Sequence, residues 1–151
     1  MKTIIVCVSE SHGNTMKVAK AMAEVLDAPV VSPEEFDAGK AGEYDLIGLG
    51  SGIYKGKHHK SILELAEKLP EPDEEQDKSV FIFSTAGKGD INQHRHLNLI
   101  ISKKGYRNAG EFICKGWDTA GLFKYIGGIN KGLPNRAMIE QARDFAKTLR
   151  A

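Results

Sequence analysis

The chain has 151 residues, of which 41% are hydrophobic and 27% charged, and its formal net charge at neutral pH is +1. This balance is that of an ordinary globular protein, and the length favours one domain, residues 1–151, with a single core. The near-neutral charge gives no support to a nucleic-acid-binding function.

The start of the chain shows no targeting signal. Residues 1–3 lead directly into a short apolar run, without the small-residue cleavage site of a signal peptide. No apolar run approaches the roughly 20 residues that a membrane-spanning helix needs. We therefore expect a cytoplasmic protein with no membrane span.

Apolar runs and helical periods alternate along the chain. Short continuous apolar runs, typical of strands buried on both faces of a parallel sheet, cover residues 4–8, 46–49, 80–83 and 112–114, with a weaker one at 30–31. Apolar residues at helical spacing cover residues 19–26, 62–69, 97–101 and 142–149. Ser32-Pro33-Glu34-Glu35 has the form of a capping box and predicts a short helix before Asp45.

This order, a strand and then a helix repeated five times, predicts an α/β fold. Right-handed crossover connections place helices on both faces of a parallel sheet, so we expect a three-layer, doubly wound arrangement. Cys7 and Cys114 lie in apolar runs and have no partner at a metal-binding spacing, so we expect them to pack in the core. No metal site is predicted.

The junction between the first strand and the first helix is the clearest candidate site. Residues 9–15 read Ser-Glu-Ser-His-Gly-Asn-Thr, and they place hydroxyl and amide groups ahead of a helix N-terminus, which favours an anion. The chain lacks both GxxxxGK[ST] and GxGxxG, the loops that bind triphosphates and dinucleotides. Neutral donors without a lysine suit one terminal phosphate. The alternative is that these side chains only cap the helix.

Two further segments are rich in small residues. They follow the third and fourth predicted strands and span residues 50–56 and 84–90. In a parallel sheet both lie at the same edge as the first junction, where such sheets bind ligands. Small residues let the backbone approach a flat ligand closely. A phosphate site beside two such loops indicates a mononucleotide with a planar ring.

These three segments, in this order, resemble the flavodoxin family, and the resemblance covers essentially the whole chain. It implies a five-stranded parallel sheet of order 2-1-3-4-5 that binds FMN non-covalently. Residues 9–15 form a phosphate loop one residue longer than the commonest flavodoxin version. That spacing, together with residues 50–59, is similar to flavodoxin-like domains of larger flavoproteins and to the menaquinone-dependent protoporphyrinogen dehydrogenases.

The resemblance also implies which residues bind the cofactor. The phosphate would be held by Ser9, Ser11, His12, Gly13, Asn14 and Thr15. The isoalloxazine would be flanked by Ser51, Gly52, Ile53, Tyr54, Thr85, Ala86, Gly87, Lys88 and Gly89. Tyr54 or Trp117 is a candidate for stacking on the ring. The alternative for each is an aromatic side chain that packs against neighbouring protein groups.

By this resemblance we expect a flavodoxin that carries one or two electrons between redox partners, such as iron–sulfur proteins or reductases. The alternative is an FMN-dependent quinone or protoporphyrinogen oxidoreductase of the same fold, for which the sequence shows no clear acid–base residue beyond histidines. A receiver domain shares the strand order but carries acidic residues after the first and third strands. This chain has Ser9, Ser11 and Gly50-Ser51 at those places.

Two clusters of basic residues lie beside the predicted flavin segments. The first consists of Lys55, Lys57, His58, His59 and Lys60, and the second of His94, Arg95 and His96. We interpret the first either as a solvated loop and helix start or as a basic rim that attracts an acidic partner.

The segment 116–135 has five glycines and several large apolar residues. Loops of this length without secondary structure are uncommon and are often functional. It is either an irregular segment packed on the core, a lid over the flavin, or a surface for a partner or second subunit.

Overall fold

The computed structural model describes residues 1–10, 13–87, 89–116 and 132–150. The predictions that concern Ser11, His12, Lys88, Trp117 and the segment 117–131 lie outside this part of the chain.

The centre of the fold is a parallel sheet. Its strands are β1 (Thr3–Val8), β2 (Val30–Val31), β3 (Leu46–Tyr54), β5 (Ser79–Ala86) and β6 (Arg107–Lys115). They lie in the order β2-β1-β3-β5-β6, and the short β4 (Lys57–His58) pairs antiparallel with the end of β3. Counted without β4, this is the predicted order 2-1-3-4-5, so the expected flavodoxin-like fold is confirmed.

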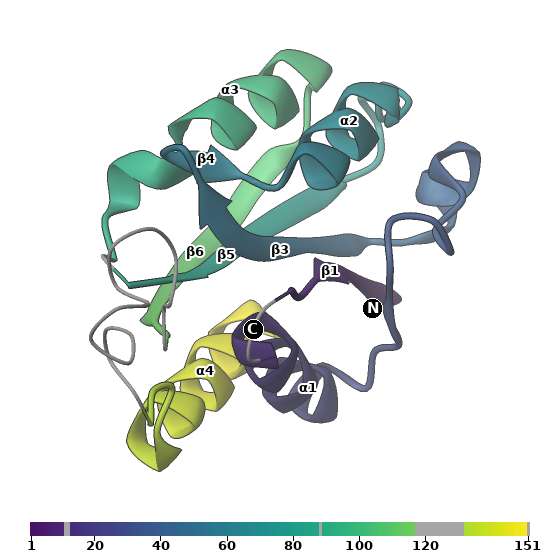
Figure 1. The fold of residues 1–151 in the computed structure, drawn as a ribbon. Helices are drawn as coiled ribbons and strands as arrows, with labels where there is room; N and C mark the ends of the chain where they lie inside the picture. The colour runs from purple at the N-terminus through teal and green to yellow at the C-terminus, as the bar shows by residue number, and fades with distance from the viewer. Residues whose placement is uncertain (11–12, 88, 117–131, 151) are drawn as a thin grey trace.

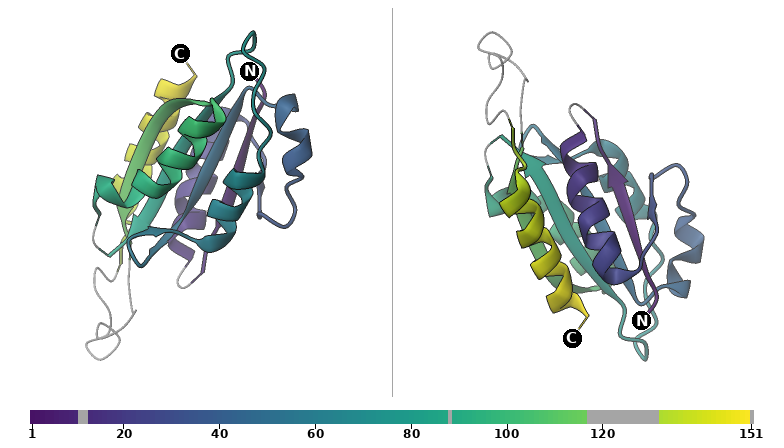
Figure 2. Two further views of the ribbon diagram at one scale, coloured as in Figure 1. Left: turned by 90° about the horizontal axis from the view of Figure 1, so that it is seen from above. Right: turned by 90° about the horizontal axis from the view of Figure 1, so that it is seen from below.

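Helices cover both faces of this sheet (Figure 1). On one face lie α1 (Asn14–Leu26) and α4 (Arg136–Leu149), and on the other α2 (Lys60–Lys68) and α3 (Arg95–Lys104). Figure 2 shows α1 and α4 side by side in its right-hand view. All four segments with helical spacing are therefore helices, which gives the three layers predicted.

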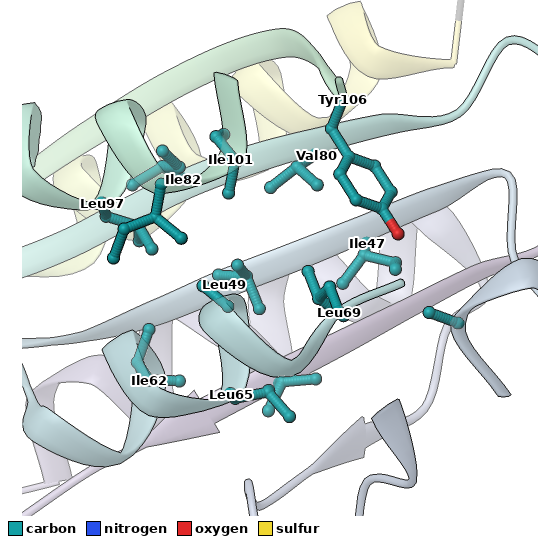
Figure 3. Packing of buried hydrophobic residues seen from close by; sticks show 14 of the residues in the cluster. Ile47, Leu49, Ile62, Leu65, Leu69, Val80, Ile82, Leu97, Ile101 and Tyr106 are labelled. Carbon is teal, nitrogen blue, oxygen red and sulfur yellow. The ribbon is translucent and has the colours of Figure 1, made fainter. Parts of the chain in front are cut away.

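The core consists of two clusters, one on each side of the sheet. Between the sheet and the helices α2 and α3, the apolar side chains of β3 and β5 meet those of the two helices (Figure 3). Tyr106 closes the end of this cluster, where its hydroxyl donates to the Pro70 carbonyl at 2.7 Å. Cys7 and Cys114 are buried and unbridged in the second cluster, which confirms that both serve as core residues.

The predicted capping box forms, but a helix does not follow it directly. Ser32 N donates to Glu35 Oε1 at 3.0 Å, and Glu35 N donates to Ser32 Oγ at 3.2 Å. These bonds close a turn. The short helix expected before Asp45 is a 3-10 helix, η2 (Ala38–Glu43), which begins after Asp37 because that side chain accepts from Gly39 N.

The strands β3 and β5 are longer than the sequence predicted. Residues 50–54 and 84–86 belong to the sheet, not to loops. The pairing of β3 with β5 continues to Gly52 opposite Thr85, residues 53–54 pair with β4, and Ala86 pairs with β6. The presence of a glycine at position 50 has a reason unrelated to a ligand. A Cβ at this position would lie 2.2 Å from the ring of Phe83, so the glycine makes room for a core aromatic side chain.

No helix within the described residues is long and apolar enough to cross a membrane.

Candidate functional site

The three predicted site segments meet at the carboxyl edge of the sheet. Val8 lies opposite Ser51, and Ser51 lies opposite Ser84. Helix α1 begins at Asn14, within the first of these segments. The register thus brings together residues that are far apart in the sequence, at the edge where parallel sheets of this kind bind ligands.

The start of α1 is shaped by Ser9 and Gly13. Ser9 Oγ accepts a hydrogen bond from Met16 N at 3.1 Å and so caps the first turn. Gly13 precedes the helix with φ 65° and ψ 21°, a left-handed conformation that favours glycine. The first turn carries no acidic residue. The positive end of the helix dipole therefore faces the junction, and no carboxylate within that turn neutralises it.

Thr15 joins this junction to the third segment. Its Oγ1 lies 2.6 Å from Thr85 Oγ1, and both residues are buried. Asn14 lies against the backbone of Gly116, where a Cβ would come within 2.6 Å of the amide nitrogen of its side chain. Gly116 N in turn donates to the carbonyl of Ala86 at 3.0 Å. The start of α1 is therefore packed against the ends of both β5 and β6.

The hairpin of β3 and β4 forms the second segment. Its turn contains Lys55 and Gly56 at positive φ. Ser51 Oγ is buried, donates to the Gly52 carbonyl at 2.6 Å and accepts from His59 N at 2.9 Å. This single hydroxyl ties the middle of β3 to the residue that follows β4. A Cβ on Gly52 would make only ordinary contacts, the shortest being 3.5 Å to Tyr54.

The remaining predicted ring-side residues line the same edge. Ile53 pairs with His58 across the hairpin, and Ala86 ends β5 opposite Lys115. Gly87 and Gly89 follow β5, and Lys88 lies outside the described residues.

Glu10 links the first segment to the hairpin. Its Oε2 accepts from the Tyr54 hydroxyl at 3.2 Å, and its Oε1 lies 3.1 Å from His59 Nε2. The Tyr54 and His59 rings lie 5.1 Å apart in a perpendicular arrangement. Burial, followed by the charge of Glu10 and its hydrogen bond, raises the pKa of Tyr54 to about 12. Tyr54 therefore stays protonated and remains a donor at physiological pH.

The basic cluster predicted from the sequence is divided in the structure. Lys55, Lys57 and Lys60 are exposed, but only 1% of the His58 surface is exposed. Burial and the neighbouring His94 lower the pKa of His58 to about 4, although its bond to the Phe83 carbonyl acts in the opposite direction. His58 is a neutral core side chain at physiological pH, so its assignment to a basic rim was wrong.

His94, from the second cluster, is also buried. Its Nδ1 lies 2.9 Å from Glu111 Oε1 and its Nε2 lies 2.6 Å from Ser84 Oγ. Burial lowers its pKa, while the hydrogen bond and charge of Glu111 oppose that shift. Arg95 and His96 are exposed. Among the described residues, no group of three or more histidine, cysteine or acidic side chains could hold a metal ion.

The described residues suit a phosphate group at the first junction. A helix start leaves its first amide N–H groups without intrahelical acceptors, and here it is flanked by hydroxyl groups. The one carboxylate described within residues 9–15, Glu10, is bonded to Tyr54 and His59. The first turn of α1 contains no acidic side chain, so none there repels a bound anion.

Comparison with known sequences gives the family. A sequence model described as a flavodoxin domain matches residues 5–112. The chain belongs to the flavodoxin family. An uncharacterized protein from Methanocaldococcus jannaschii is 42% identical over 151 residues, which is 99% of this chain and 98% of that one. Membership of the flavodoxin family implies flavin binding.

Solved structures show the same flavodoxin fold. Oxidised flavodoxin 1 from Bacillus cereus superposes with a TM-score of 0.70 at 13% identity, covering 99% of this chain and 97% of that one. Rubredoxin oxygen:oxidoreductase from Desulfovibrio gigas superposes with a TM-score of 0.66 at 12% identity, covering 99% of this chain and 35% of that one. The fold therefore occurs both as a whole protein and as part of a larger oxidoreductase.

Sequence reasoning missed two contributions to the site. Glu10 was not assigned a role, although an acidic residue inside a loop expected to bind an anion is unusual and could have drawn attention to it. Gly116 was treated as the start of a long loop, but it provides the space for Asn14. No local pattern marks that contact, because the two residues approach each other only in the folded chain.

Proposed function

We propose that this flavodoxin-family protein binds FMN and transfers one or two electrons between redox partners. The observation that carries the proposal is the meeting of the three segments at one sheet edge. Thr15 and Thr85 are joined by a hydrogen bond of 2.6 Å, and Ser51 lies between Val8 and Ser84 in the sheet. A helix start beside two strand ends suits a ligand with a phosphate at one end and a flat ring at the other.

The residues around the junction would divide the binding between them. The amide groups at the start of α1, after Gly13, would hold the phosphate, with the hydroxyl of Thr15 beside them. Ser51, Gly52 and Tyr54 would border the ring from β3. Thr85, Ala86, Gly87 and Gly89 would border it from the end of β5. Ser9 would act indirectly, because its hydroxyl caps the helix that positions these amides.

Bound FMN would supply the redox chemistry, and the protein would supply binding, orientation and the local charge. Tyr54, 37% exposed, is the large aromatic side chain that the hairpin presents at this edge. Its exposed surface supports the predicted role in stacking, which stays a prediction.

The test is a comparison of FMN with riboflavin, which lacks the phosphate. Apo-protein is titrated with each, and the quenching of flavin fluorescence gives the dissociation constants. We expect FMN to bind at least about tenfold more tightly, since charge-assisted hydrogen bonds to a phosphate contribute more than about 1.4 kcal/mol in total. Equal affinities would remove the phosphate loop from the proposal, and no binding of either compound by folded protein would end it.

A second candidate function is that of an FMN-dependent quinone or protoporphyrinogen oxidoreductase. One observation favours it: Glu10, Tyr54 and His59 form a group of hydrogen-bonded, exchangeable protons at the same edge. Such groups are suited to proton transfer to an organic substrate. Reduced protein mixed rapidly with a soluble benzoquinone or with an oxidised iron–sulfur protein separates the two functions, because the preferred oxidant reacts faster.

The cytoplasmic location and the single-domain organisation also stay predictions.

A further inference from the structure

Glu10 is an acidic residue in a place where an anion is expected. It lies between β1 and Gly13, within the segment proposed to hold a phosphate. A carboxylate there would repel a phosphate if it faced the same group of amides. Both of its oxygens are instead bonded elsewhere, one to Tyr54 at the end of β3 and one to His59, which follows β4.

The direction of these bonds follows from the helix α2. His59 is the N-cap residue of α2, and its Nδ1 accepts from Ser61 N at 3.0 Å. A backbone N–H only donates, so Nδ1 carries no proton and the neutral ring has its proton on Nε2. Nε2 therefore donates to Glu10 Oε1. With the Tyr54 hydroxyl donating to Oε2, the carboxylate accepts two hydrogen bonds.

These contacts hold Tyr54 at its hydroxyl and at its ring. The hydroxyl is bonded to Glu10, and the ring lies 5.1 Å from the His59 ring at an interplanar angle of 85°. His59 is itself held by Ser51 through its backbone and by Ser61 through its ring. A partly exposed tyrosine without such contacts would sample several rotamers, and a ligand would have to order it on binding.

We propose that Glu10 is a positioning residue, which orients Tyr54 from the phosphate loop and thereby couples binding at the phosphate end of the site to binding at the ring end. This inference rests on the proposed FMN site and assigns to it a residue whose carboxylate acts through Tyr54 and His59. Glu10 acts through hydrogen bonds, so an amide of the same shape retains the function. The Gln Oε1 accepts from His59 and its Nε2 donates to the Tyr54 oxygen.

The first test is a double-mutant cycle measured by FMN binding. Glu10→Ala is expected to weaken FMN binding by about fivefold to tenfold, the lower part of the range of coupling between sites. Tyr54→Phe keeps the ring and removes the hydroxyl, and the double variant is expected to be no weaker than Glu10→Ala alone. Glu10→Gln is expected to stay within about twofold of wild type, since it keeps both bonds. Additive effects of the two single substitutions would overturn the proposal.

A purely electrostatic role for Glu10 predicts the opposite result. If its charge only repels the phosphate, both Glu10→Ala and Glu10→Gln bind FMN more tightly than wild type, and either result would overturn the proposal. Glu64→Ala is the matched control, because the Glu64 side chain is 56% exposed, as is that of Glu10, and it pairs with Lys60 on α2. We expect this variant to bind FMN as wild type does.

The second test needs no cofactor. In the apo-protein, nuclear Overhauser contacts between the rings of Tyr54 and His59 are expected in wild type and Glu10→Gln and are lost in Glu10→Ala. Contacts that persist in Glu10→Ala would show that Glu10 does not orient Tyr54. If the contacts are lost as expected but wild type binds no FMN, the positioning role stands in the protein while the proposed function fails.

Discussion

At the scale of single residues, His58 shows how burial changes the chemistry of a side chain. It comes from a segment with three lysines and another histidine, yet it points into the core, where its Nε2 donates to the Phe83 carbonyl at 3.0 Å. Its ring lies 5.0 Å from that of His94. Two imidazole groups at this distance in the interior cannot both carry a charge without a large cost in free energy.

The stability of the protein should therefore depend on the protonation of His58. Its pKa is lowered from 6.5 to about 4, so the unfolded chain binds the proton more readily than the folded one. The stabilisation is complete above pH 6.5 and is lost as pH falls toward 4, at about 1.4 kcal/mol per pH unit for one histidine. We expect the free energy of unfolding, measured with urea, to fall between pH 6.5 and pH 5 by about 1–2 kcal/mol more in wild type than in His58→Gln.

In His58→Gln the amide still donates to Phe83, and the carboxyl groups titrate as in wild type. His96→Gln, on the exposed side of α3, is the matched control. Parallel pH curves for wild type and His58→Gln would contradict the assignment of a buried neutral His58.

Gly50 is a second residue whose role only the packing reveals. We expect Gly50→Ala to lower the free energy of unfolding by about 2–3 kcal/mol, because the added methyl group would lie 2.2 Å from the Phe83 ring. Gly42→Ala, where a Cβ has open space, is the control in the same unfolding assay. Phe83→Leu should partly rescue Gly50→Ala. The double variant should then lose less free energy of unfolding than the two single variants lose in sum. An unfolding free energy unchanged in Gly50→Ala would show that the strand has room at this point.

At the scale of elements, the hairpin of β3 and β4 is fixed by a few polar contacts. β4 has only two residues, and a pairing of that length contributes little by itself. The buried hydroxyl of Ser51 supplies the additional link, since it bonds both the Gly52 carbonyl and the His59 amide. The hairpin carries Tyr54, so its rigidity affects the proposed ring site directly.

We expect Ser51→Ala to cost about 1–2 kcal/mol of stability and to loosen the hairpin, since it leaves the His59 N–H without its acceptor. Hydrogen exchange of the His59 amide, followed by NMR, should accelerate relative to wild type. Ser102→Ala, on the exposed surface of α3, is the control. Unchanged exchange at His59 would mean that other contacts hold the hairpin.

At the scale of the whole molecule, the net charge is close to zero, so the charge that matters for a partner is the local charge of one surface. The net charge is only +1, so the overall field is weak. Lys55, Lys57 and Lys60 are exposed on and just after the hairpin, and only Lys60 has an acidic partner among the described residues, Glu64 at 3.7 Å. If electrons leave through this edge, an acidic redox partner is favoured there.

We expect Lys55→Glu/Lys57→Glu to slow electron transfer to an acidic ferredoxin by at least about threefold at low salt, with the difference shrinking at an ionic strength of about 0.15 M, where screening acts over roughly 8 Å. Stopped-flow absorbance measures the rates. Lys68→Glu/Lys103→Glu makes the same change in net charge near the C-terminal ends of α2 and α3 and should have a smaller effect. Equal slowing by both double variants would remove the hairpin from partner binding.

The element order was predictable because it depends on local patterns. The apolar run at residues 4–8 became β1 (Thr3–Val8), and the helical spacing at residues 142–149 became the C-terminal part of α4. Strand ends were less predictable. Glycines at positions 50 and 52 resemble a loop in sequence, but the sheet continues through them because Phe83 and Thr85 of β5 pair with them.

The sequence by itself determined the α/β class, the alternation of strands and helices, and the polar junction ahead of α1, because each of these is encoded in the spacing of neighbouring residues. Only the tertiary structure decided that His58 is a neutral core side chain and that Glu10 joins Tyr54 and His59, which lie 44 and 49 residues further along the chain. The physical reason is that burial and hydrogen-bond partners depend on which residues the sheet register and the helix packing bring together, and no local pattern records those contacts.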